Sequence, residues 1–270
     1  MIPAPFDYVA AESAAHAIDL LAEHDDDDAK VLAGGHSLLP MMKLRLAAPE
    51  LLIDITEVPE LAGISLDGDE LVIGAATRHA DLASSDLVRA QAPLLAHAAS
   101  LVGDPQIRHR GTIGGSLAHA DPAADLPMAL MALAGSVELR GQDGSRRVTA
   151  DDFFTGFFET ALAPGELLTA IRVPCVPDAA WGYQKFTRRS NDWAIVGAAA
   201  VAGRIALANM GSTPLRATAA EEALAGGASP AEAAALAAEG TSPGEDIHAD
   251  RAYREHLARV LTRRALEYRA

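Results

Sequence analysis

The sequence predicts a protein of the α+β class, in which mixed helices and strands are followed by a small antiparallel sheet. Strand-like and helix-like segments are interspersed up to a proline-bounded junction at residues 174–177. Beyond this junction, three closely spaced strand-like segments suggest an antiparallel meander, and the remainder reads as helical. A long glycine- and histidine-rich loop is expected at residues 102–125, and loops of this length inside a compact domain are usually functional.

The first part of the chain opens with a helix and a strand that leads into a glycine turn. Ser13 precedes a helical pattern at residues 14–21 and would cap it, and the four aspartates at 25–28 end the pattern. The strand at 31–33 runs directly into Gly34-Gly35, which places both glycines in a strand-to-helix turn. The next expected elements are a helix at 38–46, strands at 51–55 and 71–75, and helices at 78–85 and 87–101.

A helix, a hairpin and a strand complete the first part, and the second part is a meander followed by helices. These elements are a helix at 125–134, a hairpin of strands 136–140 and 146–149, a strand at 167–173, and meander strands at 182–188, 194–201 and 204–209. Breaks at 229–230 and 242–244 divide the helices that follow. The last helix is expected to place Tyr253, Leu257, Val260 and Leu261 on one face.

Composition excludes several classes of protein. The chain has 270 residues, is 50% hydrophobic and carries a formal net charge of −15, so it can bury a core but does not suit nucleic acid or an anionic membrane as its main partner. The longest apolar stretch, residues 193–203, is too short to span a bilayer, and no basic start marks a secretory signal, so we expect a cytoplasmic protein with no membrane insertion. The single cysteine, Cys175, excludes a disulfide framework or an iron–sulfur cluster held by this chain alone.

Two glycine pairs indicate a phosphate-binding function. Neither Gly34-Gly35 nor Gly114-Gly115 fits the dinucleotide or P-loop patterns, but paired glycines let backbone N–H groups approach an anion closely. Two such turns could grip the two phosphates of one pyrophosphate, and each pair taken alone could equally be a tight turn. Hydroxyl groups stand beside both pairs and could donate to phosphate oxygens, namely those of Ser37, Thr112 and Ser116.

Metal and hydrolase chemistry find little support in the sequence. His109, His119, Asp121 and Asp125 lie close together, but Pro122 interrupts them and no helical histidine pair is formed, so no metal site is expected. A Gly-x-Ser-x-Gly elbow is absent, which argues against a serine hydrolase.

Two long motifs carry a resemblance to a known family. They are AGGHSLLP at residues 33–40, followed by KLRL at 43–46, and GTIGGSLAHADP at 111–122. With YQKFTRR at 183–189, they resemble the FAD-binding medium subunit of molybdenum hydroxylases, nearest to the aerobic carbon monoxide dehydrogenase type. The resemblance covers essentially the whole chain.

The resemblance implies a fold and a division into domains. Residues 1–176 would form a two-subdomain FAD-binding domain of the vanillyl-alcohol-oxidase (PCMH) type, divided at about residue 57 into 1–57 and 58–176. Residues 177–270 would form a C-terminal domain of three antiparallel strands with helices.

The resemblance also assigns residues to non-covalently bound FAD. The pyrophosphate contacts carry over onto Ala33, Gly34, Gly35, His36, Ser37, Thr112, Ile113, Gly114, Gly115 and Ser116. Asp125 would hold a ribose or adenine-side hydroxyl, its alternative being a carboxylate at a helix start, and Leu168 would offer a backbone contact near the flavin ring. Lys185 would be the basic residue beside the flavin, in competition with Gln184, and Trp193 would stack on the ring unless it is a core aromatic opening the strand at 194–201.

The family resemblance implies an electron-transfer flavoprotein subunit. Molybdopterin and [2Fe–2S] clusters would reside on partner chains, a large and a small subunit, assembled as a dimer of heterotrimers, and FAD would pass electrons to an external acceptor. The substrate at molybdenum could be carbon monoxide, an aldehyde, a purine or another N-heterocycle. The alternatives are a self-sufficient flavin oxidase or reductase, in which His36 could attach the flavin covalently, and an assembly subunit without FAD.

Overall fold

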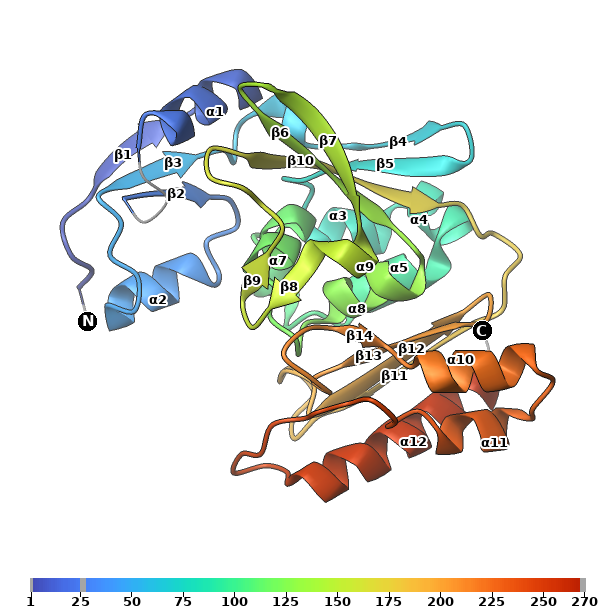
Figure 1. Ribbon diagram of the computed structural model, residues 1–270. Coiled ribbons are helices and arrows are strands. Elements are labelled where there is room, and N and C mark those ends of the chain that lie inside the picture. Colours follow the sequence, from blue (N-terminus) through green and yellow to red (C-terminus); the bar gives the residue numbers. More distant parts are fainter. Residues whose placement is uncertain (1, 25–27, 268–270) are drawn as a thin grey trace.

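The computed structural model describes residues 2–24 and 28–267, and its elements are arranged in stacked layers (Figure 1). A central sheet covers a layer of helices, the C-terminal sheet lies on the other side of these helices, and the last helices cover its far face. A small N-terminal sheet stands beside this stack. Helices and strands thus mix as expected, which confirms the α+β class.

The N-terminal sheet positions the first glycine turn. Its three strands are parallel and run in the order β1 (Asp7–Ala10), β3 (Leu51–Asp54) and β2 (Ala29–Leu32). Helix α1 (Ala14–Ala22) packs its apolar face on this sheet, and the Ser13 hydroxyl caps it by accepting the His16 N–H at 3.0 Å. The turn after β2 leads into α2 (Leu38–Leu44). Of the four aspartates expected to end α1, those at 25–27 lie outside the described residues.

The central sheet is antiparallel and has β10 in its middle. The strand order is β4 (Ile64–Asp67), β5 (Glu70–Gly74), β10 (Leu167–Pro174), β6 (Ser136–Gly141) and β7 (Gly144–Thr149). The register between β10 and β6 shifts between Leu168 and Ala170, so Thr169 lies in a bulge. The Thr169 carbonyl accepts the Ala75 N–H at 3.0 Å, which ties the bulge to the end of β5.

Two expectations about the helices are wrong. The pattern at 87–101 is broken into α4 (Asp86–Gln91) and α5 (Pro93–Ser100), because Pro93 keeps Ala92 out of the helical conformation. The segment 102–125 is not a loop but contains α6 (Pro105–Arg108) and α7 (Ile113–His119), whose N-termini are capped by the side chains of Asp104 and Thr112.

The other elements of this part are η1 (Pro59–Leu61), α3 (His79–Ser84), α8 (Asp125–Ala132), α9 (Ala150–Phe153), β8 (Phe154–Gly156) and β9 (Glu159–Thr160).

The C-terminal sheet is packed on both faces. Its strands are β11 (Trp181–Phe186), β12 (Val196–Val201), β13 (Arg204–Ala208) and β14 (Leu215–Arg216), so a two-residue fourth strand extends the expected three. On one face α8 packs so closely that a Cβ on Gly197 would lie 3.0 Å from Met128 Cε. On the other face, a Cβ on Gly182 would lie 1.9 Å from the Ala265 carbonyl oxygen of the last helix. Every residue of β12 is therefore buried.

Three helices cover the outer face of the C-terminal sheet: α10 (Thr218–Ala225), α11 (Pro230–Ala235) and α12 (Arg251–Glu267). Leu257 and Leu261 are buried as expected, but Tyr253 is 42% exposed. The expected apolar face of α12 is rotated because Arg254 takes the buried position at its start, where it donates to the Ile195 carbonyl and to Asp246. In the part of the chain that the structure describes, no helix could cross a bilayer.

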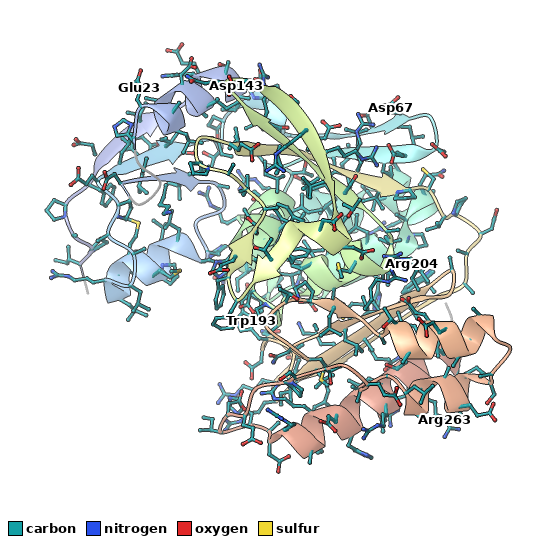
Figure 2. The ribbon with its side chains drawn as sticks, in the orientation of Figure 1. Glu23, Asp67, Asp143, Trp193, Arg204 and Arg263 are labelled. Carbon is teal, nitrogen blue, oxygen red and sulfur yellow. The ribbon has the colours of Figure 1, made fainter. Side chains whose placement is uncertain are left out.

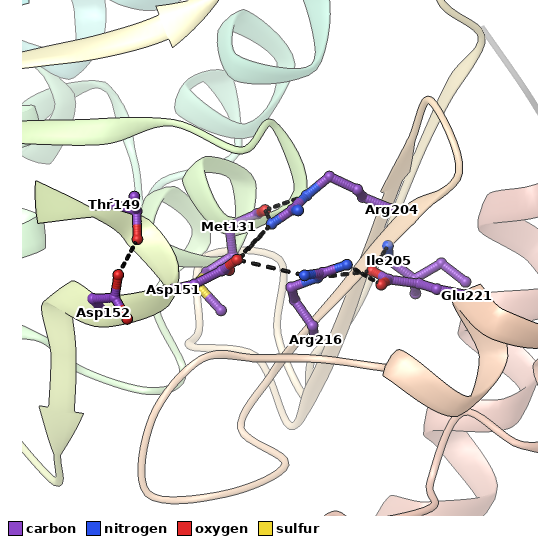
Figure 3. A network of polar contacts seen from close by, with 8 residues as sticks. All are labelled: Met131, Thr149, Asp151, Asp152, Arg204, Ile205, Arg216 and Glu221. Carbon is purple, nitrogen blue, oxygen red and sulfur yellow. Dashed lines mark hydrogen bonds and ion pairs between the residues drawn. The ribbon is translucent and has the colours of Figure 1, made fainter.

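Ion pairs fasten the C-terminal sheet to the rest of the molecule at the end of α8 (Figure 3). Arg204 donates to the Met131 carbonyl at 3.0 Å and pairs with Asp151 at 3.1 Å. Arg216 reaches the same carboxylate at 3.4 Å and also pairs with Glu221. Asp151 therefore joins α9 to two strands of the C-terminal sheet.

Candidate functional site

The two glycine motifs cross one another in the structure. A Cβ added to Gly34 would lie 2.5 Å from the Arg110 carbonyl oxygen and 2.6 Å from the Gly111 Cα. A Cβ added to Gly115 would lie 3.8 Å from the Ala33 Cβ. Residues 33–37 and 111–116, far apart in sequence, thus form one continuous surface, and only glycine fits at the crossing.

The first turn presents a row of free backbone amides. Gly35 has φ +75°, a conformation that L side chains rarely adopt, and it bends the chain between β2 and α2. None of the N–H groups of residues 34–37 donates a hydrogen bond to residues 2–24 or 28–267. The Ser37 side chain makes no capping bond either. Successive free N–H groups of this kind form an anion-binding concavity.

The second motif differs from the expected open turn. Gly114 and Gly115 lie in the first turn of α7, and the amides of residues 113–116 are all engaged within the protein. Ile113 donates to the Thr77 carbonyl, Gly114 to the Ala75 carbonyl, Gly115 to Thr112 Oγ1 and Ser116 to the Thr112 carbonyl. Gly114 is required by packing, because its Cβ would lie 2.6 Å from the Ala75 Cβ. The second motif therefore offers its hydroxyls rather than free amides.

Three hydroxyl groups at the crossing can still donate. The Thr112 Oγ1 accepts the Gly115 N–H at 3.2 Å, and its own proton finds no acceptor in the described part of the chain. The hydroxyls of Ser37 and Ser116 make no hydrogen bond to any described residue. The two segments that meet at the crossing thus carry three neutral donors and a row of free amides, which suits an anion such as a pyrophosphate.

A buried histidine that the sequence analysis did not single out lies directly behind the crossing. His79 is 4% exposed, and a Cβ on Gly111 would lie 2.7 Å from its Cδ2. Burial, with smaller contributions from the charges of His36 and Arg108, lowers the pKa of His79 to about 4, so its ring is neutral at pH 7. Its Nδ1 is buried without a hydrogen-bond partner among the described residues. The adjacent Arg78 pairs through its backbone with Thr112, a contact between distant segments that no local sequence signal indicates.

A second cluster joins α8 to the C-terminal sheet. The Asp125 carboxylate accepts a hydrogen bond from the Tyr183 hydroxyl through Oδ1 and pairs with Lys185 Nζ at 2.9 Å through Oδ2. Burial raises the pKa of Asp125, although Lys185 and Tyr183 both oppose that shift. Asp125 lies in the first turn of α8 and is 4% exposed, and each of its carboxylate oxygens accepts one hydrogen bond within the protein. Its expected contact with a ribose or adenine-side hydroxyl stays a prediction.

Lys185 and Gln184 are adjacent on β11, so their side chains point to opposite faces of the sheet. Tyr183 and Lys185 are two residues apart on β11 and face α8, so Gln184 faces the opposite side, toward α12. Of these two candidates, Lys185 therefore shares the side of Asp125. Its neighbour Tyr183 had no expected role, and its position two residues before Lys185 was the available signal.

The remaining two expected residues, Leu168 and Trp193, lie outside the two glycine motifs. Leu168 is buried at the β10 bulge, and its neighbour Thr169 reaches Gly114 through Ala75 by two backbone hydrogen bonds. Trp193 is 56% exposed in the connection between β11 and β12 and is not a core aromatic (Figure 2). That connection is held by the Asn209 side chain, which donates to the Ala194 carbonyl at 2.8 Å.

Metal chemistry has no site in the described residues, since no group of three or more His, Cys, Asp or Glu side chains there could hold an ion. The features that do gather are free amides, hydroxyls, an unpartnered buried histidine nitrogen and close glycine packing. These fit a bound diphosphate group.

Nearly the whole chain matches known protein families and characterised relatives. Residues 4–176 match the family described as the FAD binding domain in molybdopterin dehydrogenase, and residues 181–268 match the CO dehydrogenase flavoprotein C-terminal domain. The carbon monoxide dehydrogenase medium chain of Hydrogenophaga pseudoflava is 45% identical, over 98% of this chain and 97% of the relative. The nicotine 6-hydroxylase medium subunit of Paenarthrobacter nicotinovorans is 38% identical, over 96% and 95%.

Solved structures share the fold. Carbon monoxide dehydrogenase from Hydrogenophaga pseudoflava, in a form that lacks the Mo-pyranopterin moiety, superimposes with a TM-score of 0.94 at 47% identity and covers 98% of this chain and 97% of that one. Quinoline 2-oxidoreductase from Pseudomonas putida 86 gives a TM-score of 0.92 at 35% identity, with 98% and 97% covered.

Proposed function

The chain belongs to the family of FAD-binding medium subunits of molybdenum hydroxylases, and from this premise we propose that it is the electron-transfer flavoprotein subunit of such a complex. It takes electrons from iron–sulfur clusters of a small partner subunit and passes them to an external acceptor. The observation that carries this proposal is the crossing of Gly34 with Gly111, which brings the two motifs together.

We assign the FAD pyrophosphate to this crossing. The amides of residues 34–37 donate to phosphate oxygens, and the hydroxyls of Ser37, Thr112 and Ser116 complete the set without adding positive charge. Ala33, Ile113, Gly114 and Gly115 shape the surface by packing. His79 supports the crossing from behind as a neutral ring.

The flavin end of the cofactor is assigned to the boundary with the C-terminal domain. Bound FAD supplies the chemistry of accepting two electrons singly and releasing them as a pair or singly. Lys185 supplies a donor there, Asp125 holds Lys185, Leu168 contributes its backbone and Trp193 covers the ring. We propose a domain boundary at residues 176 and 177, with an FAD-binding part divided at about residue 57.

The flavin is held non-covalently in this proposal. His36 is exposed on the first turn, and its backbone amide belongs to the row of free donors. In this proposal the amide row and the neighbouring hydroxyls hold the diphosphate, without a covalent bond through His36.

We propose the partner subunits from the family to which the chain belongs. Iron–sulfur clusters need several thiolates, and Cys175 is the only cysteine of the chain, which agrees with clusters carried by another subunit. We assign the clusters to a small subunit and molybdopterin to a large subunit, and we propose a dimer of such heterotrimers. The relatives' names include carbon monoxide, nicotine, caffeine and glyceraldehyde, so similar flavoprotein subunits serve complexes with different substrates. We assign the choice of substrate to the large subunit.

The decisive experiment uses the purified full chain. It should bind one FAD per chain, and acid precipitation should release all of the flavin into the supernatant. Flavin that stays with the precipitate would replace non-covalent binding by attachment through His36. A chain that binds no FAD, alone or assembled with its partners, would overturn the proposed function in favour of an assembly subunit.

A further inference from the structure

Tyr183 is buried at the junction between the two domains. It is 7% exposed, and its ring packs edge-on against the His97 imidazole of α5, with ring centroids 5.4 Å apart. Trp181 lies on the same face of β11 and also contacts His97, with the two ring centroids 5.2 Å apart. These contacts fix the position of the Tyr183 hydroxyl before any ligand is present.

The position of the Tyr183 hydroxyl determines which oxygen of the Asp125 carboxylate pairs with Lys185. Burial and the nearby Asp125 charge raise the pKa of Tyr183 well above its ordinary value, so the phenol keeps its proton and acts as a donor. It donates to Oδ1, which leaves Oδ2 for Lys185. The side chains of Lys185 and Asp125 are only 8% and 3% exposed, and a buried ion pair of this kind needs additional hydrogen bonds to hold its geometry.

Lys185 is left with one unused donor. Of its three N–H bonds, one goes to Asp125 and one to the Leu101 carbonyl at 3.4 Å. No other acceptor among the described residues takes the third. A buried ammonium held from two sides with a free N–H is suited to donate to a ligand.

We propose that Tyr183 is a positioning residue that orients Lys185, through Asp125, toward the bound flavin. This inference rests on the proposed function, since it takes Lys185 to lie beside the flavin ring. Without the Tyr183 hydroxyl, Oδ1 of Asp125 is buried and unsatisfied, so the carboxylate turns and carries Lys185 with it. The ammonium then loses the orientation in which its third N–H meets the cofactor.

The test is the flavin reduction potential of the FAD-loaded full chain. A positive donor beside the ring favours the electron-rich reduced flavin. Lys185→Gln and Tyr183→Phe should therefore each lower the ratio of reduced to oxidised FAD about tenfold. For a two-electron couple this is a decrease of the reduction potential by about 30 mV. The double variant should shift no further than Lys185→Gln alone, because Tyr183 acts through Lys185. Tyr8→Phe is the matched control, since the exposed Tyr8 hydroxyl also donates to a carboxylate, Asp54, at 2.6 Å, and it should leave the potential unchanged.

Each other result overturns the inference in a recognisable way. Additive shifts in the double variant would show that Tyr183 acts independently of Lys185, and a Tyr183→Phe variant with the parent potential would show that it does not position Lys185. An unchanged potential in Lys185→Gln, with FAD still bound, would remove Lys185 from the flavin while leaving the proposed function intact. If Tyr183→Phe does not fold, Asp125→Glu replaces it: it keeps the negative charge but moves the carboxylate that links Tyr183 to Lys185, so it should lower the potential as Lys185→Gln does.

Discussion

Gly34 and Gly111 pack backbone against backbone, so closely that a Cβ on Gly34 would lie 2.6 Å from the Gly111 Cα. This contact fixes where the free amides of the first turn lie relative to the hydroxyls of the second motif. The N-terminal sheet carries one partner, and the segment before α7 carries the other. Cofactor binding and the packing of these two parts therefore depend on the same pair of residues.

Gly34→Ala should separate the two motifs. The added methyl group meets backbone atoms of Arg110 and Gly111, which cannot rotate away as a side chain could. We expect a loss of unfolding free energy of about 3 kcal/mol and loss of FAD binding. Chemical denaturation and flavin titration measure the two effects. Gly244→Ala is the control, because nothing lies within 4 Å of a Cβ there, and it should change neither.

Removal of the free hydroxyls should weaken FAD binding without weakening the fold. The Ser37 and Ser116 side chains make no hydrogen bond to a described residue, so Ser37→Ala and Ser116→Ala should leave the melting temperature of the FAD-free chain unchanged. Each should weaken FAD binding by about 1.5 kcal/mol, the value of a hydrogen bond to a charged group. Thr112→Ala provides the contrast: it also removes the α7 cap and should cost about 1 kcal/mol of stability. Unchanged FAD affinity in both serine variants would move the pyrophosphate elsewhere.

The sequence predicted the glycine motifs but not the way in which the second one works. Hydrophobic periodicity is undefined across a stretch rich in glycine, histidine and proline, so residues 102–125 were interpreted as a loop. The local capping signals were present, since the side chains of Asp104 and Thr112 each accept a hydrogen bond from the backbone N–H three residues later. Because of this capping, Gly114 and Gly115 form the start of a helix and not an open turn, and their N–H groups already donate hydrogen bonds within the protein.

Contacts between distant segments account for most of what the sequence could not reveal. Asp125, Tyr183 and Lys185 meet because α8 packs on the C-terminal sheet, and no local pattern encodes that packing. The burial of Arg254 in α12 likewise depends on the Ile195 carbonyl and on Asp246. By contrast, the strands at 71–75, 136–140 and 167–173 were predicted closely, because apolar periodicity and turn residues act locally.

His79 should make stability depend on pH. Its pKa is about 4 in the folded protein and 6.5 when exposed, so between these values the unfolded chain binds more protons than the folded chain. The stabilising contribution is complete above pH 6.5 and is lost as pH falls toward 4, a loss of about 3 kcal/mol. His79→Gln removes this titration, so its unfolding free energy should vary less between pH 6.5 and pH 4.5 than that of the parent chain. Identical slopes for the two proteins would contradict the neutral, buried state of His79.

Asp151 should hold the C-terminal sheet against α8 and α9. It pairs with both Arg204 and Arg216, whereas the adjacent Asp152 bonds only to the Thr149 hydroxyl among the described residues (Figure 3). Because the Asp151 side chain is 41% exposed, Asp151→Ala should cost only about 1 kcal/mol. It should nevertheless speed proteolysis in the connection at 174–181, while Asp152→Ala should not. Equal cleavage rates for both variants would show that packing alone holds the domains together.

Trp193 should stack on the flavin without contributing to the fold. Its side chain is 56% exposed, so Trp193→Ala should leave the melting temperature of the FAD-free chain nearly unchanged. Loss of the aromatic contact and its burial should weaken FAD binding by about 1–2 kcal/mol. A stacked indole quenches flavin fluorescence by electron transfer, so the variant with FAD bound should emit more strongly.

Trp181 provides the control that separates stacking from general loosening of the C-terminal sheet. It contacts His97 with ring centroids 5.2 Å apart, so Trp181→Ala should lower the melting temperature. Its bound flavin should remain as quenched as in the parent chain, because Trp193 is still present. Opposite responses of the two variants, one in fluorescence and one in stability, are expected only if Trp193 lies on the flavin. Equal fluorescence in both variants, with unchanged FAD affinity in Trp193→Ala, would mean that another residue covers the ring.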